Sequence, residues 1–121
     1  NLKLHEEYYE ISKHTAEKLD DAKQERRNII AVGTTVVRTL ESAGNKKGII
    51  EKLSGTTDLF ITEDYKLKFV HSIITNFHVP KSSLLMLVSA FIGRKNLFEL
   101  YEIAKKNNFR FFSFGDGMFI K

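Results

Sequence analysis

The fold class is decided by one stretch of sequence, IIAVGTTVVRTLESAG, which occupies residues 29–44. Its first four residues form a short apolar run that ends at Gly33, which is typical of a strand buried on both faces. Apolar residues then recur at helical spacing until Gly44, a residue that commonly ends helices. A buried strand, a tight turn and a helix in succession predict an α/β fold.

The flanking sequence extends this pattern in both directions. Ser12 is suited to cap a helix with charged faces, and residues 84–92 predict a helix that is apolar nearly all round. Residues 58–62 and 67–75 predict strands that could form a hairpin, and residues 109–114 and 118–120 predict two more strands. We expect a mixed, largely parallel sheet with flanking helices, parallel where a helix connects strands, with residues 29–32 as a buried central strand.

Composition limits the class of protein. The chain has 121 residues, 42% apolar and 28% charged, with a net charge of +4 and no cysteine. These values exclude a disordered chain, a disulfide scaffold and a cysteine-based zinc site, and they suit a reducing cytoplasm. The longest apolar stretch is about half of the ~20 residues that a spanning helix needs. All ten phenylalanines lie at or after Phe60, so the core material is unevenly distributed, and we expect a piece of a longer chain that self-associates when isolated.

The turn at Gly33 is one candidate site, because a helix N-terminus presents free N–H groups to an anion. Spacing alone favours a simpler role, in which Thr34 or Thr35 caps the helix. Arg38, one turn further on, could pair with Glu41 on the surface or reach back to a bound carboxylate or phosphate. Spacing alone favours the surface pair. There is no dinucleotide or nucleoside-triphosphate fingerprint.

Residues 76–83, NFHVPKSS, form a second candidate site at the mouth of the apolar helix. His78 could move protons, whereas Lys81 and the N–H groups beyond Ser82 could hold an anion. A structural role, in which the chain's only proline fixes a turn and Ser82 caps the helix, is equally consistent with the sequence. Asp116 could shape a turn or face a cleft, and a metal pair of His5 with Glu7 is weakly indicated, so we expect no metal.

Five runs, in order, resemble one family, the S-adenosylmethionine:tRNA ribosyltransferase-isomerases of queuosine biosynthesis. They are HEEYYEIS (5–12), IIAVGTTVVRTLES (29–42), DLFI (58–61), ITNFHVPKSSLLMLVSAF (74–91) and RFFSFGDGMFI (110–120). The resemblance implies that residues 1–121 are a fragment of a larger two-domain enzyme, namely the C-terminal part of its α/β domain and roughly a third of its length. Its N-terminal part would then be absent.

The resemblance implies transfer and isomerisation of the ribosyl part of S-adenosylmethionine onto 7-aminomethyl-7-deazaguanine in tRNA, which gives epoxyqueuosine. That chemistry needs a base, an acid and groups that bind anions. Proton transfer is assigned to His78 or Glu7, with Asp116 in reserve. The expected substrate contacts are Thr34, Thr35, Arg38, Asn76, Lys81 and Ser82. Two alternatives are a non-catalytic α/β nucleic-acid-binding module and a structural or interaction domain.

Overall fold

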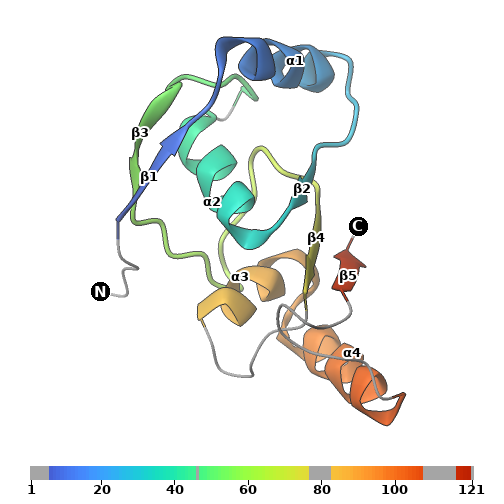
Figure 1. The fold of residues 1–121 in the computed structure, drawn as a ribbon. Helices are drawn as coiled ribbons and strands as arrows, with labels where there is room; N and C mark the ends of the chain where they lie inside the picture. The colour runs from blue at the N-terminus through green and yellow to red at the C-terminus, as the bar shows by residue number, and fades with distance from the viewer. Residues whose placement is uncertain (1–5, 46, 77–82, 108–116, 121) are drawn as a thin grey trace.

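Strands and helices alternate along most of the chain in the computed structural model, which describes residues 6–45, 47–76, 83–107 and 117–120 (Figure 1). The elements are β1 Glu7–Glu10, α1 Lys13–Gln24, β2 Ile30–Val32, α2 Thr34–Ala43, β3 Ser54–Thr57, β4 Ser72–Asn76, α3 Ser83–Ile92, α4 Arg94–Lys106 and β5 Gly117–Ile120. None of these helices is long and apolar enough to cross a bilayer. The expected α/β class is confirmed.

Helix α2 lies between two small sheets, as Figure 1 shows. Strands β1 and β3 form an antiparallel pair, whereas β2, β4 and β5 form the second sheet in the order β2-β4-β5. Helix α2 contacts β3 of the first sheet and both β2 and β4 of the second. Because both sides of the helix are covered, Arg38 and Glu41 are buried together with Val37, Leu40 and Ala43.

The strand, turn and helix expected over residues 29–44 are confirmed. Gly33 precedes α2 with φ 97°, a left-handed conformation that favours glycine, and its N–H donates to the Ile74 carbonyl at 2.8 Å. Gly44 ends the helix and donates to the Leu40 carbonyl. A side chain at Gly44 would meet the ring of Phe69 at 2.5 Å, so this position requires close approach as well as a helix end.

Strand directions are only partly as expected. Strands β2 and β4 are parallel, but β4 and β5 are antiparallel although helices connect them. The described part of this connection contains two helices, α3 and α4, which follow one another at Gly93, whereas α2 is the one helix in the described part of the connection from β2 to β4. The described side chains of α3, residues 86–92, are buried or half-buried, as predicted.

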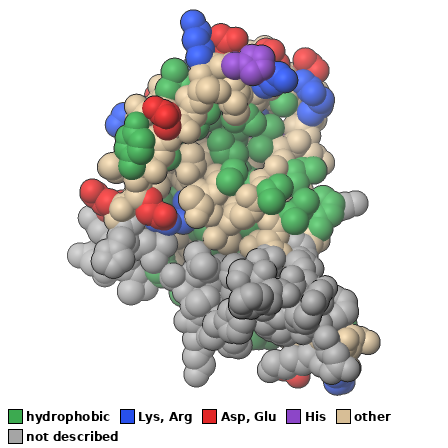
Figure 2. Space-filling model, in the orientation of Figure 1, with side chains coloured by type: hydrophobic (Ala, Val, Ile, Leu, Met, Phe, Trp, Pro, Cys, Tyr) green, Lys and Arg blue, Asp and Glu red, His purple; other side chains and the backbone are tan. Residues whose placement is uncertain are grey.

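The expectation that residues 29–32 form a central strand buried on both faces is wrong for the described sheet. Strand β2 lies at the edge, and the side chains of Ile30 and Val32 are 48% and 65% exposed. Val32 is in register with Ile74, which is 38% exposed, and Ile74 is in register with Phe119. Figure 2 shows hydrophobic side chains on this outer face over β2, β4 and β5. On the other face the row formed by Ala31, Ile73 and Ile120 is buried.

The predicted hairpin of residues 58–62 with 67–75 is also wrong. Residues 58–62 are not a strand, β4 begins only at Ser72, and the strand that precedes them, β3, pairs with β1. A β1–β3 pair joins segments that are more than 40 residues apart, so no local pattern signals it. Strand β5 confirms the prediction for residues 118–120, whereas residues 109–114 lie outside the described residues.

Candidate functional site

The carboxyl ends of β2 and β4 and the first residue of β5 lie at one edge of the second sheet. The turn at Gly33 follows β2 and is hydrogen-bonded to Ile74, the middle residue of β4. Asn76, the last residue of β4, is in register with Gly117, the first residue of β5. The carboxyl ends of parallel strands are where α/β sheets bind ligands. This edge therefore holds Gly33, at the N-terminus of α2, together with Asn76 and Gly117.

The two threonines of the turn do not cap α2. Gly33 is the N-cap residue, and no side chain makes a capping hydrogen bond there. The capping interpretation of Thr34 and Thr35 is therefore wrong. Thr34 is buried, whereas Thr35 is exposed and lines a groove beside β1 and α1. Of the two hydroxyls, only that of Thr35 is presented to a molecule in solution.

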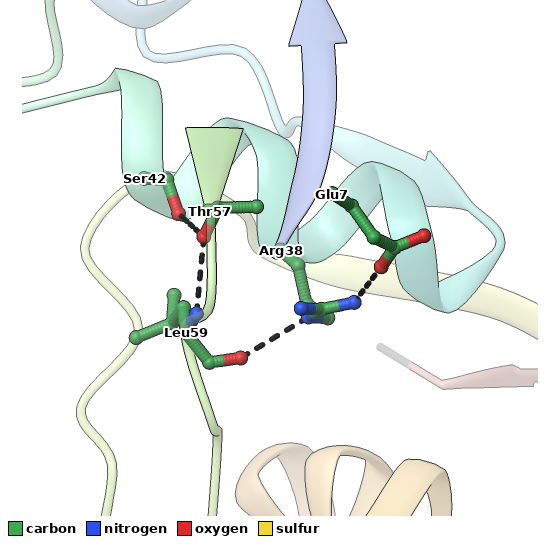
Figure 3. A network of polar contacts seen from close by, with 5 residues as sticks. All are labelled: Glu7, Arg38, Ser42, Thr57 and Leu59. Atoms are coloured by element: carbon green, nitrogen blue, oxygen red, sulfur yellow. Dashed lines mark hydrogen bonds and ion pairs between the residues drawn. The ribbon is translucent and has the colours of Figure 1, made fainter. Parts of the chain in front are cut away.

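Arg38 and Glu7 form an ion pair between α2 and the start of β1 (Figure 3). The Arg38 Nη1 group donates to Glu7 Oε1, and its Nε donates to the Leu59 carbonyl at 3.1 Å. The Arg38 side chain is only 5% exposed, whereas Glu7 is 46% exposed. The guanidinium is thus a fixed, buried cation behind a carboxylate that faces solvent. Such a carboxylate can accept a proton or orient a cationic substrate group.

The loop that meets Arg38 is itself anchored to α2. Thr57 Oγ1 lies 2.5 Å from Ser42 Oγ and accepts the N–H of Leu59 at 3.1 Å, which holds the Leu59 carbonyl toward Arg38 (Figure 3). The remaining amino group of Arg38, Nη2, is buried and has no hydrogen-bond partner among the described residues. A guanidinium has five N–H donors, so this cation keeps donor capacity that two protein acceptors do not use.

The prediction that Arg38 pairs with Glu41 on the surface is wrong. Both side chains are buried, and Glu41 instead accepts four hydrogen bonds from the segment that leads into β4. Its Oε1 accepts from the Tyr65 hydroxyl at 3.0 Å and the Lys68 N–H at 2.9 Å, and its Oε2 accepts from the N–H groups of Phe69 and Val70 at 2.8 and 2.9 Å. Burial, and then the charge of Glu41, raises the pKa of Tyr65, so its hydroxyl stays a donor.

Sequence reasoning missed this carboxylate because its four donors are mostly backbone groups, which carry no sequence signal. One feature of the sequence does indicate that Glu41 is buried. It lies on a helix that has apolar residues on most of its sides. A helix covered on both sides buries its polar residues as well, and buried polar groups must find partners.

His71 makes a hydrogen bond next to the first residues of the β2–β4 pair. The Ile29 N–H donates to His71 Nδ1 at 2.9 Å, which requires that nitrogen to be unprotonated. Burial first, and then the nearby charge of Lys23, lowers the pKa of His71 below its ordinary value near 6.5, although Glu41 opposes this shift. The folded chain therefore favours the neutral imidazole.

We expect this histidine to give the fold a specific pH dependence. Because its folded-state pKa is lowered, its contribution to the free energy of unfolding is fully present above about pH 6.5 and is lost as the pH falls through the folded-state pKa. Urea unfolding at a series of pH values measures this slope in the wild type and in His71→Asn, whose amide oxygen also accepts a hydrogen bond. His71→Asn should flatten the slope below about pH 6.5, and His14→Asn, on the exposed face of α1, should not. Equal slopes in the wild type and His71→Asn would contradict this role.

The remaining predicted site residues are not placed by the structure. His78, Lys81, Ser82 and Asp116 lie outside the described residues, as does His5, and of Asn76 only the position in β4 is described. Among the residues that are described, no group of three His, Asp or Glu side chains could hold a metal ion. The structure therefore brings Glu7 together with Arg38, and the turn at Gly33 together with β4.

Comparisons with known proteins agree with this architecture. A family model described as "Queuosine biosynthesis protein" matches residues 1–120. Proteins named S-adenosylmethionine:tRNA ribosyltransferase-isomerase are 56% identical over 118 residues in Carboxydothermus hydrogenoformans and 50% identical over 121 residues in Clostridioides difficile. These matches cover 98% and 100% of this chain but 35% and 36% of the relatives, so the chain spans about a third of their length.

A solved structure is similar as well. The crystal structure of an S-adenosylmethionine tRNA ribosyltransferase from Thermotoga maritima superposes with a TM-score of 0.85 at 44% identity. The match covers 94% of this chain and 40% of that one. Sequence and fold thus agree over nearly the whole chain, which belongs to the queuosine biosynthesis protein family, the S-adenosylmethionine:tRNA ribosyltransferase-isomerases.

Proposed function

We propose that this chain forms the C-terminal part of the α/β domain of an S-adenosylmethionine:tRNA ribosyltransferase-isomerase. The whole enzyme would transfer the ribosyl group of S-adenosylmethionine to 7-aminomethyl-7-deazaguanine in tRNA and rearrange it to epoxyqueuosine, with release of adenine and methionine. A tRNA substrate suits a cytoplasmic location. The observation that carries the proposal is the convergence of the Gly33 turn, Asn76 and Gly117 at one sheet edge.

The reaction requires two proton transfers. A proton must leave the carbon beside the sulfonium, which needs a base, and departure of adenine is assisted by an acid. We assign these steps to His78 or Glu7, with Asp116 as the third candidate. Glu7 is supported by its exposed carboxylate, which Arg38 holds in one place. A held carboxylate loses less conformational freedom when it meets the substrate.

The methionine carboxylate and the RNA phosphates are anions and need cations or N–H donors. We assign these contacts to Thr34, Thr35, Arg38, Asn76, Lys81 and Ser82. The buried Nη2 group of Arg38 supports its place in this set because its donor capacity is unused among the described residues. Thr34 is buried, so its contribution would come from its backbone N–H at the start of α2.

Replacing Arg38 should weaken substrate binding. The experiment uses a chimera in which this chain replaces the matching 36% of the C. difficile relative. Loss of a charge-assisted hydrogen bond costs about 1.5–3 kcal/mol, so Arg38→Ala should raise the Kd for S-adenosylmethionine or tRNA about tenfold or more. Isothermal titration calorimetry measures S-adenosylmethionine binding, and filter binding measures tRNA.

Arg27→Ala is the matched control, because Arg27 pairs with Glu25 on the exposed surface. It should leave both affinities unchanged. Because Arg38 also ties α2 to β1, circular dichroism and the urea midpoint must show that the Arg38→Ala chimera is folded at the assay temperature. A folded Arg38→Ala chimera with wild-type affinity for both substrates would remove Arg38 from the site.

We also propose that the chain on its own self-associates. Its outer sheet face exposes Ile30, Val32 and Ile74, which lie next to one another on adjacent strands. Contiguous apolar surface of this kind favours association when nothing else covers it. In light scattering, the mass of the isolated chain should rise with its concentration.

A further inference from the structure

The second sheet is apolar on both faces, but helices of the described chain cover only one. On the covered face, Ala31 and Ile73 are buried in register with each other. On the outer face, the corresponding row is Val32 and Ile74, and Ile30 lies on the same face two residues before Val32. Parallel strands are almost always covered on both faces, and here β2 and β4 are a parallel pair. The outer row thus has the composition of a buried face.

This outer face continues into a groove. A groove of about 500 Å³ lies between β1, α1, β2 and α2, and Ile30 belongs to both the outer row and the groove wall. Val36 of α2 and Tyr8 of β1, both exposed, also line it, and Glu10 is the sole charged residue in the described lining. In Figure 2 hydrophobic side chains are visible in the hollow between α1 and α2.

We propose that the outer row of Ile30, Val32 and Ile74, together with this groove, is the surface on which the rest of the family's polypeptide packs in the full-length enzyme. Relatives are about three times as long as this chain, so most of their length lies outside it. The covering segment should present an apolar face, most simply that of a helix, as in other sheets with parallel strands. The inference rests on family membership and not on the proposed activity.

Charge argues against tRNA as the occupant. Phosphate contacts require Lys or Arg, and dominate the affinity of proteins for nucleic acid. The described groove lining contains no basic residue, and its single charged residue is acidic. A second copy of the chain is the other apolar occupant, and the experiment must separate it from the remainder of the polypeptide.

The absence of cysteine from the chain makes that experiment direct. Val32→Cys places a thiol on the outer row, and Ile103→Cys places one on α4, where Ile103 is 58% exposed. Both are introduced into the isolated chain and into the C. difficile chimera whose other cysteines have been replaced by serine. The rate of maleimide labelling is then measured for each thiol over a range of protein concentrations.

In the isolated chain at low concentration, both thiols should react at similar rates. In the chimera, Val32→Cys should react at about one-tenth of its rate in the isolated chain, or more slowly still, at every concentration. Ile103→Cys should react at the same rate in both proteins. Ile30→Cys provides a second position on the same row in case Val32→Cys perturbs the strand. Protection in the chimera that appears only as concentration rises would assign the face to a second copy and overturn the proposal. Full reactivity of both row positions in the chimera would overturn it too.

Discussion

Glu41→Ala is expected to destabilise the chain by about 3–5 kcal/mol, a large share of the ~5–15 kcal/mol that a domain has in total. The substitution removes the acceptor for three backbone N–H groups and for the Tyr65 hydroxyl. Two of those N–H groups belong to the buried residues Phe69 and Val70 and would have no water to replace the carboxylate. Each buried donor left unsatisfied costs about 1–3 kcal/mol. Urea unfolding of the chain, followed by circular dichroism, measures the loss.

Two further variants separate the carboxylate's role from simple loss of volume. Glu41→Gln keeps the shape of the side chain but places an amide N–H against backbone donors. It should therefore lower the free energy of unfolding by about half as much as Glu41→Ala, or more. Glu51→Ala removes an exposed carboxylate and should change stability by no more than about 0.5 kcal/mol. If Glu41→Ala were as stable as Glu51→Ala, the four hydrogen bonds of Glu41 would not stabilise the segment that leads into β4.

His78→Ala is expected to lower turnover of the chimeric enzyme about 10²-fold or more, with little change in the Kd for S-adenosylmethionine. A positioned imidazole with an unperturbed pKa near 6.5 can exchange protons at neutral pH, and general acid–base catalysis contributes factors of this size. The residue follows Asn76 by two positions, and Asn76 ends β4 at the sheet edge beside the Gly33 turn. Release of adenine from S-adenosylmethionine in the presence of tRNA measures turnover.

His14→Ala is the matched control, because His14 is an exposed histidine on α1. It should retain wild-type turnover. Wild-type turnover in His78→Ala would make His78 a structural residue and leave Glu7 and Asp116 as the candidates for proton transfer. Glu7→Gln in the same assay then distinguishes these two, since it removes the carboxylate's basicity and keeps its volume.

Sequence reasoning succeeded where structure is set by neighbouring residues. The run over residues 29–44 predicted a strand, a glycine turn and a helix that ends at Gly44, and each is present. Ser12 was expected to begin a helix, and its hydroxyl does accept the Thr15 N–H. These features depend on local hydrogen bonds and on the conformational freedom of glycine, so the sequence within a few positions is sufficient.

The features that could not be predicted are those that depend on which distant segments meet. The pairing of β1 with β3 makes residues 54–57 a strand, and β3 contacts a side of α2 that would otherwise face solvent. Arg38 is buried on that side, and Glu41 is buried against the segment that leads into β4, whereas helical spacing alone would leave the two as a surface pair. The exposure of the outer face of β2 could not be predicted either. An apolar run indicates that a strand is to be covered but not which segment covers it.

Formation of epoxyqueuosine by the C. difficile chimera tests the central claim most directly, namely that this chain supplies part of the ribosyltransferase-isomerase site. With S-adenosylmethionine and tRNA that carries 7-aminomethyl-7-deazaguanine, the chimera should form epoxyqueuosine and release adenine, and the isolated chain should form none. Mass spectrometry of nucleosides from the digested tRNA detects the product. A folded chimera that binds tRNA but makes no epoxyqueuosine would contradict the claim, and turnover by the isolated chain would show that the site does not need the rest of the enzyme.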